Sequence, residues 1–160
     1  LNIGSAGGLI EGMEIGDIII SSKTLHHDVD ATAIHCDIGQ LPGMPKEYPS
    51  DPSLIDLAEK AMGSLSINYQ VGIIGSGDAF IADQKRVAEI KRNFPEIMAV
   101  EMEAAAIAQV AYLYETPFIV LRALSDLPDQ EMPMSFVEYL DFAAENSAKI
   151  LLKVIESLPT

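Results

Sequence analysis

The chain has 160 residues, 49% of them hydrophobic and 21% charged, a composition that suits a folded domain with a substantial core and excludes a disordered segment. Its formal net charge is −14, which argues against nucleic acid as a partner. The apolar runs are too short to cross a bilayer, and Cys36, the only cysteine, cannot form an intrachain disulfide and favours a cytoplasmic location.

The chain opens on Leu1-Asn2-Ile3, a pattern typical of the end of a buried strand, and runs into the glycine-rich segment 4–8. We expect this segment to be a tight turn that brings backbone N–H groups and a Ser hydroxyl close to a ligand; the alternative is a plain strand-to-helix turn. A domain rarely starts at the end of its own central strand. We therefore expect residues 1–160 to form a single domain that is incomplete at its N-terminus.

Strand and helix patterns alternate along the rest of the chain. Runs of apolar and β-branched residues predict buried strands at 17–21, 70–74 and 118–121. Start signals and apolar periodicity predict helices at 51–62, 83–94, 101–115 and 136–158. The Ala-rich third helix is expected to be buried, and residues 23–50 are expected to form a long loop. This order predicts an α/β fold with a parallel or mixed sheet.

Ligands of such sheets bind beyond the carboxyl ends of the strands. This rule selects three segments, at 4–8, 75–80 and 122–126, as the walls of a pocket. The second of them carries Phe80 just beyond a glycine-bracketed strand end. An aromatic side chain there either stacks on a planar base or fills the core.

Two acids stand on either side of Met102 where the Ala-rich helix begins, in the segment Val100-Glu101-Met102-Glu103. One interpretation is a favourable interaction with the helix N-terminus, worth under about 1 kcal/mol for each acid. The other is a carboxylate that accepts hydrogen bonds from a sugar diol. The sequence alone leaves both open.

Arg122, one of only three arginines, stands where the last strong strand emerges, four residues before Asp126. A buried arginine normally pairs with a nearby acid, and Asp126 beside Ser125 could be a loop cap. A partly desolvated Asp can instead act as a general acid. Potential metal ligands occur at 26, 27, 35 and 36, but their spacing matches no zinc pattern, so no metal site is expected. The chain has no GxSxG elbow, so a serine-hydrolase triad is not expected either.

Taken together, these segments resemble the nucleoside phosphorylase/nucleosidase superfamily, and most closely the 5'-methylthioadenosine/S-adenosylhomocysteine nucleosidases. The matching stretches are NIGSAGGL, GDIIIS, HHDVDATA, GQLPGMP, SGDAFI, NFPEIMAVEMEAAAIAQVA and PFIVLRALSD. The resemblance implies an α/β fold with a mixed, partly barrel-like central sheet flanked by helices. It also implies an N-glycosyl hydrolase that releases adenine, uses no cofactor, acts in methionine salvage and forms a homodimer.

The resemblance further implies a role for each site residue. Asp126 would protonate N7 of adenine and Ser125 would orient it, while Phe80 would stack on the base and the backbone of Ile81 would read its edge. The substrate-binding segment would comprise Val100, Glu101, Met102 beneath the sugar and Glu103 on the ribose hydroxyls. Outside these two groups, Ser5 and Arg122 would lie near the attacking water, Phe136 near the 5'-alkylthio group, and Ile34 and Pro42 at the neighbouring subunit's pocket.

One feature departs from this family pattern. Family members carry, near the N-terminus, a Glu that activates the water, and no residue here matches it; Glu11 and Glu14 fall on a surface-type turn. If residues 1–160 are the entire polypeptide, we expect very weak or absent hydrolysis with nucleoside binding retained; if another segment supplies that Glu, we expect the full enzyme to be competent. Two alternatives remain: another purine nucleosidase or phosphorylase of the superfamily, and a non-catalytic nucleoside-binding relative.

Overall fold

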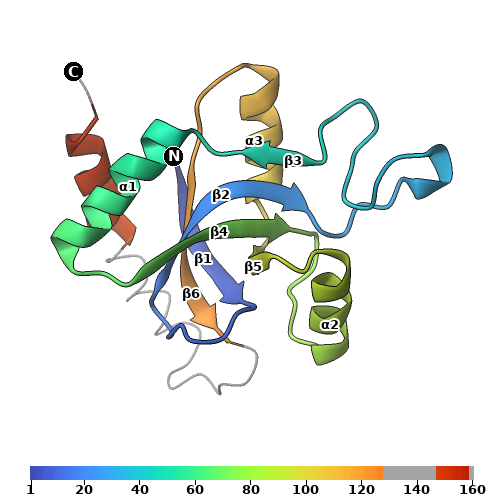
Figure 1. Cartoon of the computed structure of the whole chain (residues 1–160), viewed down its shortest axis with the longest axis horizontal. Coiled ribbons are helices and arrows are strands. Elements are labelled where there is room, and N and C mark those ends of the chain that lie inside the picture. Colours follow the sequence, from blue (N-terminus) through green and yellow to red (C-terminus); the bar gives the residue numbers. More distant parts are fainter. Residues whose placement is uncertain (128–146, 159–160) are drawn as a thin grey trace.

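The computed structural model describes residues 1–127 and 147–158 of the chain (Figure 1). The strands are β1 (Asn2–Gly8), β2 (Ile18–His26), β3 (Glu47–Pro49), β4 (Tyr69–Ser76), β5 (Ile97–Glu101) and β6 (Val120–Asp126). The helices are α1 (Pro52–Leu65), α2 (Gln84–Asn93) and α3 (Ala104–Leu113), with a short 3-10 turn at Thr32–Ile34. Residues 147–156 are also helical.

The strands form one mixed sheet that closes on itself. Their order is β3-β2-β4-β5-β1-β6, and β6 also pairs with β2. Five strands therefore form a barrel, and β3 pairs with β2 at its side. Pairing is parallel for β2–β4, β4–β5 and β1–β6 and antiparallel for β1–β5, β2–β3 and β2–β6. The expected α/β fold with a mixed, partly barrel-like sheet is thus confirmed.

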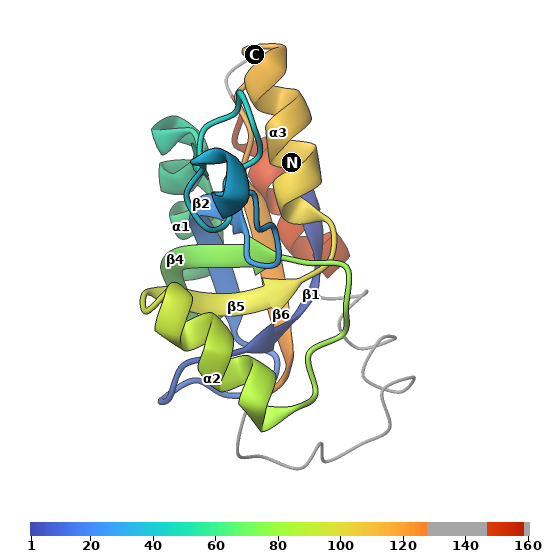
Figure 2. The same cartoon turned by 90° about the vertical axis from the view of Figure 1, so that its right-hand side faces the viewer.

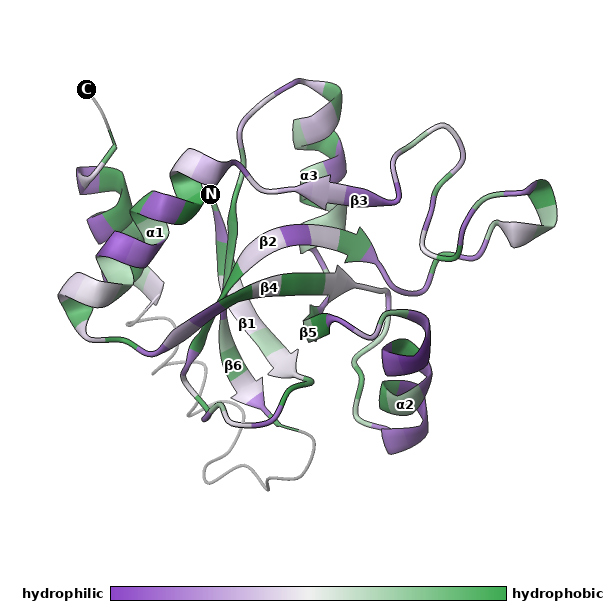
Figure 3. Ribbon diagram, viewed as in Figure 1, coloured by the Kyte–Doolittle hydropathy of each residue, from purple (hydrophilic) through white to green (hydrophobic). Residues whose placement is uncertain are grey.

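Helices cover the sheet on separate sides (Figures 1 and 2). Helix α1 and residues 147–156 pack together, with Met62 and Val154 in one apolar cluster with Ile20 of β2. Helix α3 contributes Ala104 to a second cluster, and α2 contributes Ile90 to a third. Most of α2 is hydrophilic, as its purple ribbon shows, and only one of its residues is buried (Figure 3). Among the described residues, no helix is long and apolar enough to cross a membrane.

Two of the three segments expected to be pocket loops are strands. Residues 4–8 belong to β1 and 122–126 to β6, which lie side by side with Gly4 opposite Arg122. A Cβ at Gly4 would lie 3.2 Å from Nη1 of Arg122, so a residue without a side chain lets the two strands pair over a buried guanidinium. The prediction of a turn at 4–8 was wrong because small residues have a weak intrinsic strand propensity. Pairing with the neighbouring strands outweighs that propensity here.

The Ala-rich segment differs from its prediction in two respects. Its first residue, Glu101, ends β5, a strand that the sequence patterns did not predict, and α3 begins only at Ala104. The helix is not buried all round: Ala104, Ala105 and Ala108 are buried, while Val110 is 55% and Leu113 60% exposed. Alanines allow close approach to the sheet, which leaves the larger side chains on the outer face.

Two other predictions need correction or fall outside the described part. The predicted loop at 23–50 contains the second half of β2 and all of β3. Of the predicted helix at 136–158, residues 147–156 are helical, and its earlier part, with Phe136, lies outside the described residues.

Candidate active site

Asp126 ends β6 and is held by the residue before it. Ser125 Oγ donates a hydrogen bond to Asp126 Oδ1 at 2.5 Å and lies 3.2 Å from the carbonyl oxygen of Ala6 on β1. The other carboxylate oxygen, Oδ2, faces Gly7, where a Cβ would lie only 3.0 Å away. One oxygen of the half-buried carboxylate is therefore fixed by a hydroxyl, while the other faces a position without a side chain.

A small cavity of about 30 Å³ brings the expected base-binding residues to this carboxylate. Its lining is drawn from three strand ends and the loop after β4: Gly7, Ala79, Phe80, Ile81, Val100, Glu101, Met102 and Asp126. An adjoining cavity of about 70 Å³ shares Gly7, Ile81, Val100 and Asp126 with it. The small cavity is thus lined by residues from all three of the segments 4–8, 75–80 and 122–126.

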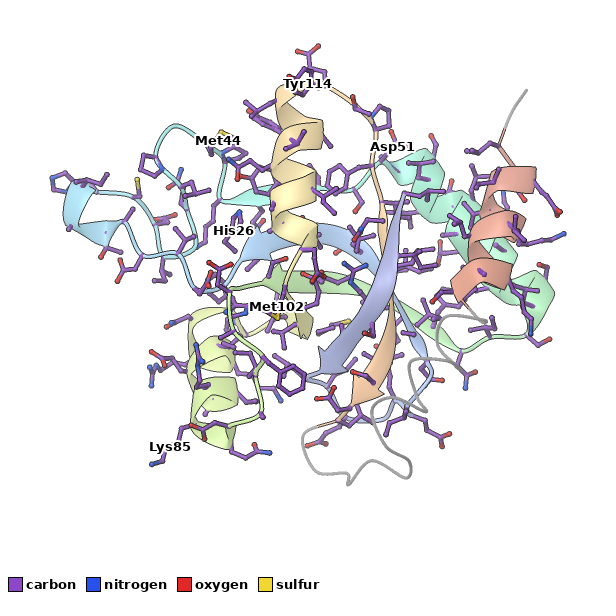
Figure 4. The ribbon with its side chains drawn as sticks, turned by 180° about the vertical axis from the view of Figure 1, so that it is seen from behind. His26, Met44, Asp51, Lys85, Met102 and Tyr114 are labelled. Atoms are coloured by element: carbon purple, nitrogen blue, oxygen red, sulfur yellow. The ribbon has the colours of Figure 1, made fainter. Side chains whose placement is uncertain are left out.

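The side chains around this cavity divide into buried and exposed ones. Ile81 is 9% exposed, whereas Phe80 is 65% and Met102 46% exposed. Phe80 is therefore not a core residue, which removes one of the two interpretations left open by the sequence. Met102 lies in the connection between β5 and α3 (Figure 4).

Glu101 is buried and fully engaged within the protein. Its carboxylate accepts hydrogen bonds from the backbone N–H of Glu103 at 3.2 Å and of Ala104 at 2.9 Å, and from the hydroxyl of Ser76. Ser76 in turn accepts the N–H of Ala105 at 2.7 Å. Of the two interpretations offered for this acidic segment, the interaction with the helix N-terminus describes Glu101, because its carboxylate satisfies amides of the first turn of α3.

Arg122 completes this buried network from β6. The guanidinium, 1% exposed, donates through Nη2 to Glu101 Oε2 at 2.5 Å and to Asn2 Oδ1 at 2.6 Å, and through Nε to the same Glu101 oxygen at 3.1 Å. The pairing of Arg122 with a nearby acid, one of the sequence-based alternatives, is thus present. A buried charge is tolerated here because it is both paired and hydrogen-bonded.

Glu103 is the carboxylate of this group that remains open to solvent. Its side chain is 63% exposed, and one oxygen lies 3.5 Å from Arg122 Nη2. Desolvation by burial, and then the charge of neighbouring Glu101, raises the pKa of Glu103, while Arg122 opposes the shift. Two carboxylates therefore share one guanidinium, and the outer one keeps its acceptor oxygens for a ligand.

The other predicted residues lie at different distances from this centre. Strand register pairs Gly4 with Arg122 and Ser5 with Ala123, so the side chains of Ser5 and Arg122 leave opposite faces of the sheet. Ile34 is 61% exposed and Pro42 is also exposed, both in the long connection between β2 and β3. Neither belongs to the cavity at Asp126.

A larger cavity lies elsewhere. It measures about 760 Å³ and lies between the end of α3 and the chain entering α1, with Tyr48, Tyr112, Leu113 and Phe118 among its lining residues. Its lining includes neither the carboxylates of Glu101, Glu103 and Asp126 nor Arg122 and Ser125. We therefore assign the active site to the smaller cavities, because these hold the groups that can transfer a proton.

Two residues of the site were missed by sequence reasoning. Ser76 links Glu101 to α3, and Asn2 accepts from Arg122. For Ser76, the available signal was a hydroxyl at the last position of a buried strand. For Asn2, it was a polar residue within the apolar start of the chain. Among the described residues, no group of three or more His, Cys, Asp or Glu could hold a metal ion.

Comparisons with known proteins agree on one group of relatives. A family profile of the phosphorylase superfamily matches residues 1–156. The 5'-methylthioadenosine/S-adenosylhomocysteine nucleosidase of Lysinibacillus sphaericus is 48% identical over 159 residues, which cover 99% of this chain and 69% of that protein.

Solved structures give the same result. The nucleosidase of that name from Neisseria meningitidis, in complex with methylthio-immucillin-A, superposes with a TM-score of 0.90 at 46% identity, covering 98% of this chain and 69% of that one. The S-adenosylhomocysteine nucleosidase from Streptococcus pyogenes, in complex with 5-methylthiotubericidin, has a TM-score of 0.90 at 40% identity, covering 99% of this chain and 67% of that one.

Proposed function

The chain belongs to the phosphorylase superfamily and, within it, to the 5'-methylthioadenosine/S-adenosylhomocysteine nucleosidases, and from this we propose that it hydrolyses the N-glycosidic bond of both nucleosides to release adenine. The observation that carries the proposal is the Ser125-held carboxylate of Asp126 in one cavity with Phe80 and Ile81. A proton donor and a surface for a planar base are the two elements that departure of adenine requires.

In this proposal Asp126 protonates N7 of adenine as the bond to the sugar breaks. Protonation makes the base a neutral leaving group, while positive charge develops on the ribose in an oxocarbenium-like transition state. General-acid help of this kind is worth roughly 10²–10⁴-fold in rate. The Ser125 hydroxyl, by holding Oδ1, leaves Oδ2 beside Gly7 to carry the proton.

The base and sugar lie on the open side of the small cavity. Its volume of about 30 Å³ suits one water molecule and is too small for a purine. The base therefore lies between the exposed Phe80 and the backbone of Ile81, with the ribose over Met102. Glu103, whose side chain is open to solvent, accepts hydrogen bonds from the two ribose hydroxyls.

Arg122 favours hydrolysis over phosphorolysis. Its guanidinium is already engaged by Glu101 and Asn2, so it is poorly available for a phosphate cosubstrate. The predicted position of Ser5 and Arg122 near the attacking water remains a hypothesis. Glu11 and Glu14 are exposed in the turn between β1 and β2, which makes them unsuited to activating that water.

We also propose that two copies of the chain associate through the outer face of α3. Ile107, Val110, Leu113 and Tyr114 recur at helical spacing and are 41–79% exposed, and Tyr114 projects from the far end of the helix (Figure 4). The adjoining cavity at Tyr112 offers a recess for side chains of the second copy. Exposed Ile34 and Pro42 would then reach the partner's thioether pocket.

Sedimentation velocity tests this association. We expect a dimer that Leu113→Glu converts to a monomer, while Leu152→Glu, at an equally exposed leucine on residues 147–156, leaves it intact. A monomeric parent protein, or a dimer insensitive to Leu113→Glu, would contradict the proposal. A cytoplasmic location, favoured by the single Cys36, and a place in methionine salvage complete the proposed role.

The function itself is tested by following adenine release from 5'-methylthioadenosine with and without inorganic phosphate. Hydrolysis predicts free methylthioribose at the same rate in both buffers. A sugar phosphate formed only with added phosphate would identify a phosphorylase. Binding of adenine without release from either nucleoside would mean either that a further segment has to supply the water-activating Glu or that the protein is a non-catalytic relative.

A further inference from the structure

The loop that follows β4 carries Phe80 and Ile81, and its first residues are fixed from two directions. Gly77 donates its N–H to the carbonyl oxygen of Glu101 on β5 at 3.1 Å. Asp78 donates its N–H to Asp28 Oδ2 at 2.7 Å, across 50 residues of sequence. These two consecutive amides are therefore bonded on opposite sides of β4, one to the last residue of β5 and one to a residue just beyond β2.

Asp28 reaches this amide because β2 and β4 end together. The two strands pair in parallel up to His26 and Ser76, and His27 extends the pairing by donating its N–H to the carbonyl oxygen of Ser76 at 2.9 Å. The next residue, Asp28, then stands level with Gly77 and Asp78. Its exposed carboxylate accepts a charge-assisted bond, which is shorter and stronger than one between neutral groups.

Gly77 makes this approach close. A Cβ on Gly77 would lie 2.4 Å from Cε1 of His27, 2.6 Å from its Nε2 and 2.9 Å from Oδ2 of Asp28. The His27 ring is only 7% exposed, so it cannot swing away easily. The imidazole of His27 thus packs against the backbone at Gly77, and the carboxylate of Asp28 accepts the N–H of the next residue, Asp78.

We propose that Asp28 is a positioning residue for the base: its bond to the Asp78 amide, made beside the His27 imidazole, sets the loop that presents Phe80 and Ile81 to adenine. The inference rests on the proposed function, since it specifies how that site binds its base. Asp28 touches neither Asp126 nor the cavity beside it, so it acts on the position of the loop and not on proton transfer.

Binding of the base therefore depends on Asp28, whereas overall stability depends on it little. The carboxylate is exposed, and its loss leaves Gly77 still bonded to Glu101. Without the bond to Asp78, the loop has to be ordered at the moment of binding, and that cost reduces affinity. Interactions with the base are similar in the ground and transition states, so KM changes more than kcat.

The test compares Asp28→Ala with Asp28→Asn and with Asp30→Ala. The amide oxygen of Asn can still accept the Asp78 N–H. Asp30 is an exposed carboxylate in the same connection, but its hydrogen bonds run to Thr32 within its own turn. Adenine affinity by calorimetry, kcat and KM for 5'-methylthioadenosine, and the melting temperature are measured for each variant.

We expect Asp28→Ala to weaken adenine binding and raise KM by about ten-fold, the loss for one charge-assisted hydrogen bond that preorganises a loop, with kcat changed less than about two-fold. Asp28→Asn should recover most of the affinity, and Asp30→Ala should match the parent. Equal affinity in Asp28→Ala and the parent, or a loss confined to kcat or to melting temperature, would overturn the inference. A parent protein that binds no adenine would instead refute the proposed function.

Discussion

Removing either partner of the buried ion pair between Arg122 and Glu101 should destabilise the protein, and removing both should cost less than the sum of the two single losses. Arg122→Met leaves the Glu101 carboxylate, 3% exposed, without its counter-ion. Loss of one partner of a buried pair costs about 3–5 kcal/mol. Glu101 keeps its bonds to Ser76 and to the first turn of α3, which places the expected cost near the lower limit, at about 3 kcal/mol. That corresponds to a fall in Tm of about 6–12 °C for a domain of this size.

The assay is a double-mutant cycle by urea unfolding, followed by circular dichroism at pH 7.5. We expect Arg122→Met and Glu101→Gln each to lose stability, and the double variant to lose less than the sum by at least about 1 kcal/mol, because residues in one buried network do not act additively. Single-variant losses under about 1 kcal/mol, or strict additivity, would refute this account of the network.

Two other predictions concern residues that face the ligand. The pKa of Glu103 is raised in the folded protein above its ordinary value of 4.5, so the folded state binds the proton more readily than the unfolded state and the ionised carboxylate opposes folding at neutral pH. Glu103→Gln should therefore raise Tm slightly at pH 7.5, a gain that shrinks as the pH is lowered through the raised pKa towards 4.5, while kcat/KM falls; a Tm gain that grows on acidification would show the sign to be wrong. Gly7→Ala places a Cβ 3.0 Å from Asp126 Oδ2, and the displaced carboxylate should cost about 10- to 100-fold in kcat/KM. Gly63→Ala in α1, where a Cβ meets nothing within 4 Å, is the matched control, and equal activity of the two variants would contradict the assigned position of Asp126.

The sequence allowed prediction of the site better than of the strands that build it. Phe80 and Asp126 each follow a recognisable change from apolar strand to polar or glycine-rich segment, and both line the small cavity. Segment 2–8 contains little but small residues after Ile3. Its strand therefore depends on pairing with β6, whose residues are 118 positions away (Gly4 opposite Arg122), and no local pattern carries that contact.

The orientation of α3, and the hydrogen bond that holds the loop carrying Phe80 and Ile81, could not be predicted from the sequence for a similar reason. A helix that is apolar on every side does not reveal which face meets the sheet, and here the alanines do. Asp28 looked like one polar residue in a long loop. Its importance depends on β2 and β4 ending at the same level, which is a property of sheet register and not of the residues near Asp28.

The central claim is that Asp126 is the acid that releases adenine, and the most direct measurement is adenine release from 5'-methylthioadenosine in phosphate-free buffer by the parent protein and by Asp126→Asn. The account predicts release by the parent and a loss of about 10²-fold or more in kcat for the variant, with adenine binding and Tm little changed. A folded Asp126→Asn protein that releases adenine at the parental rate would contradict it.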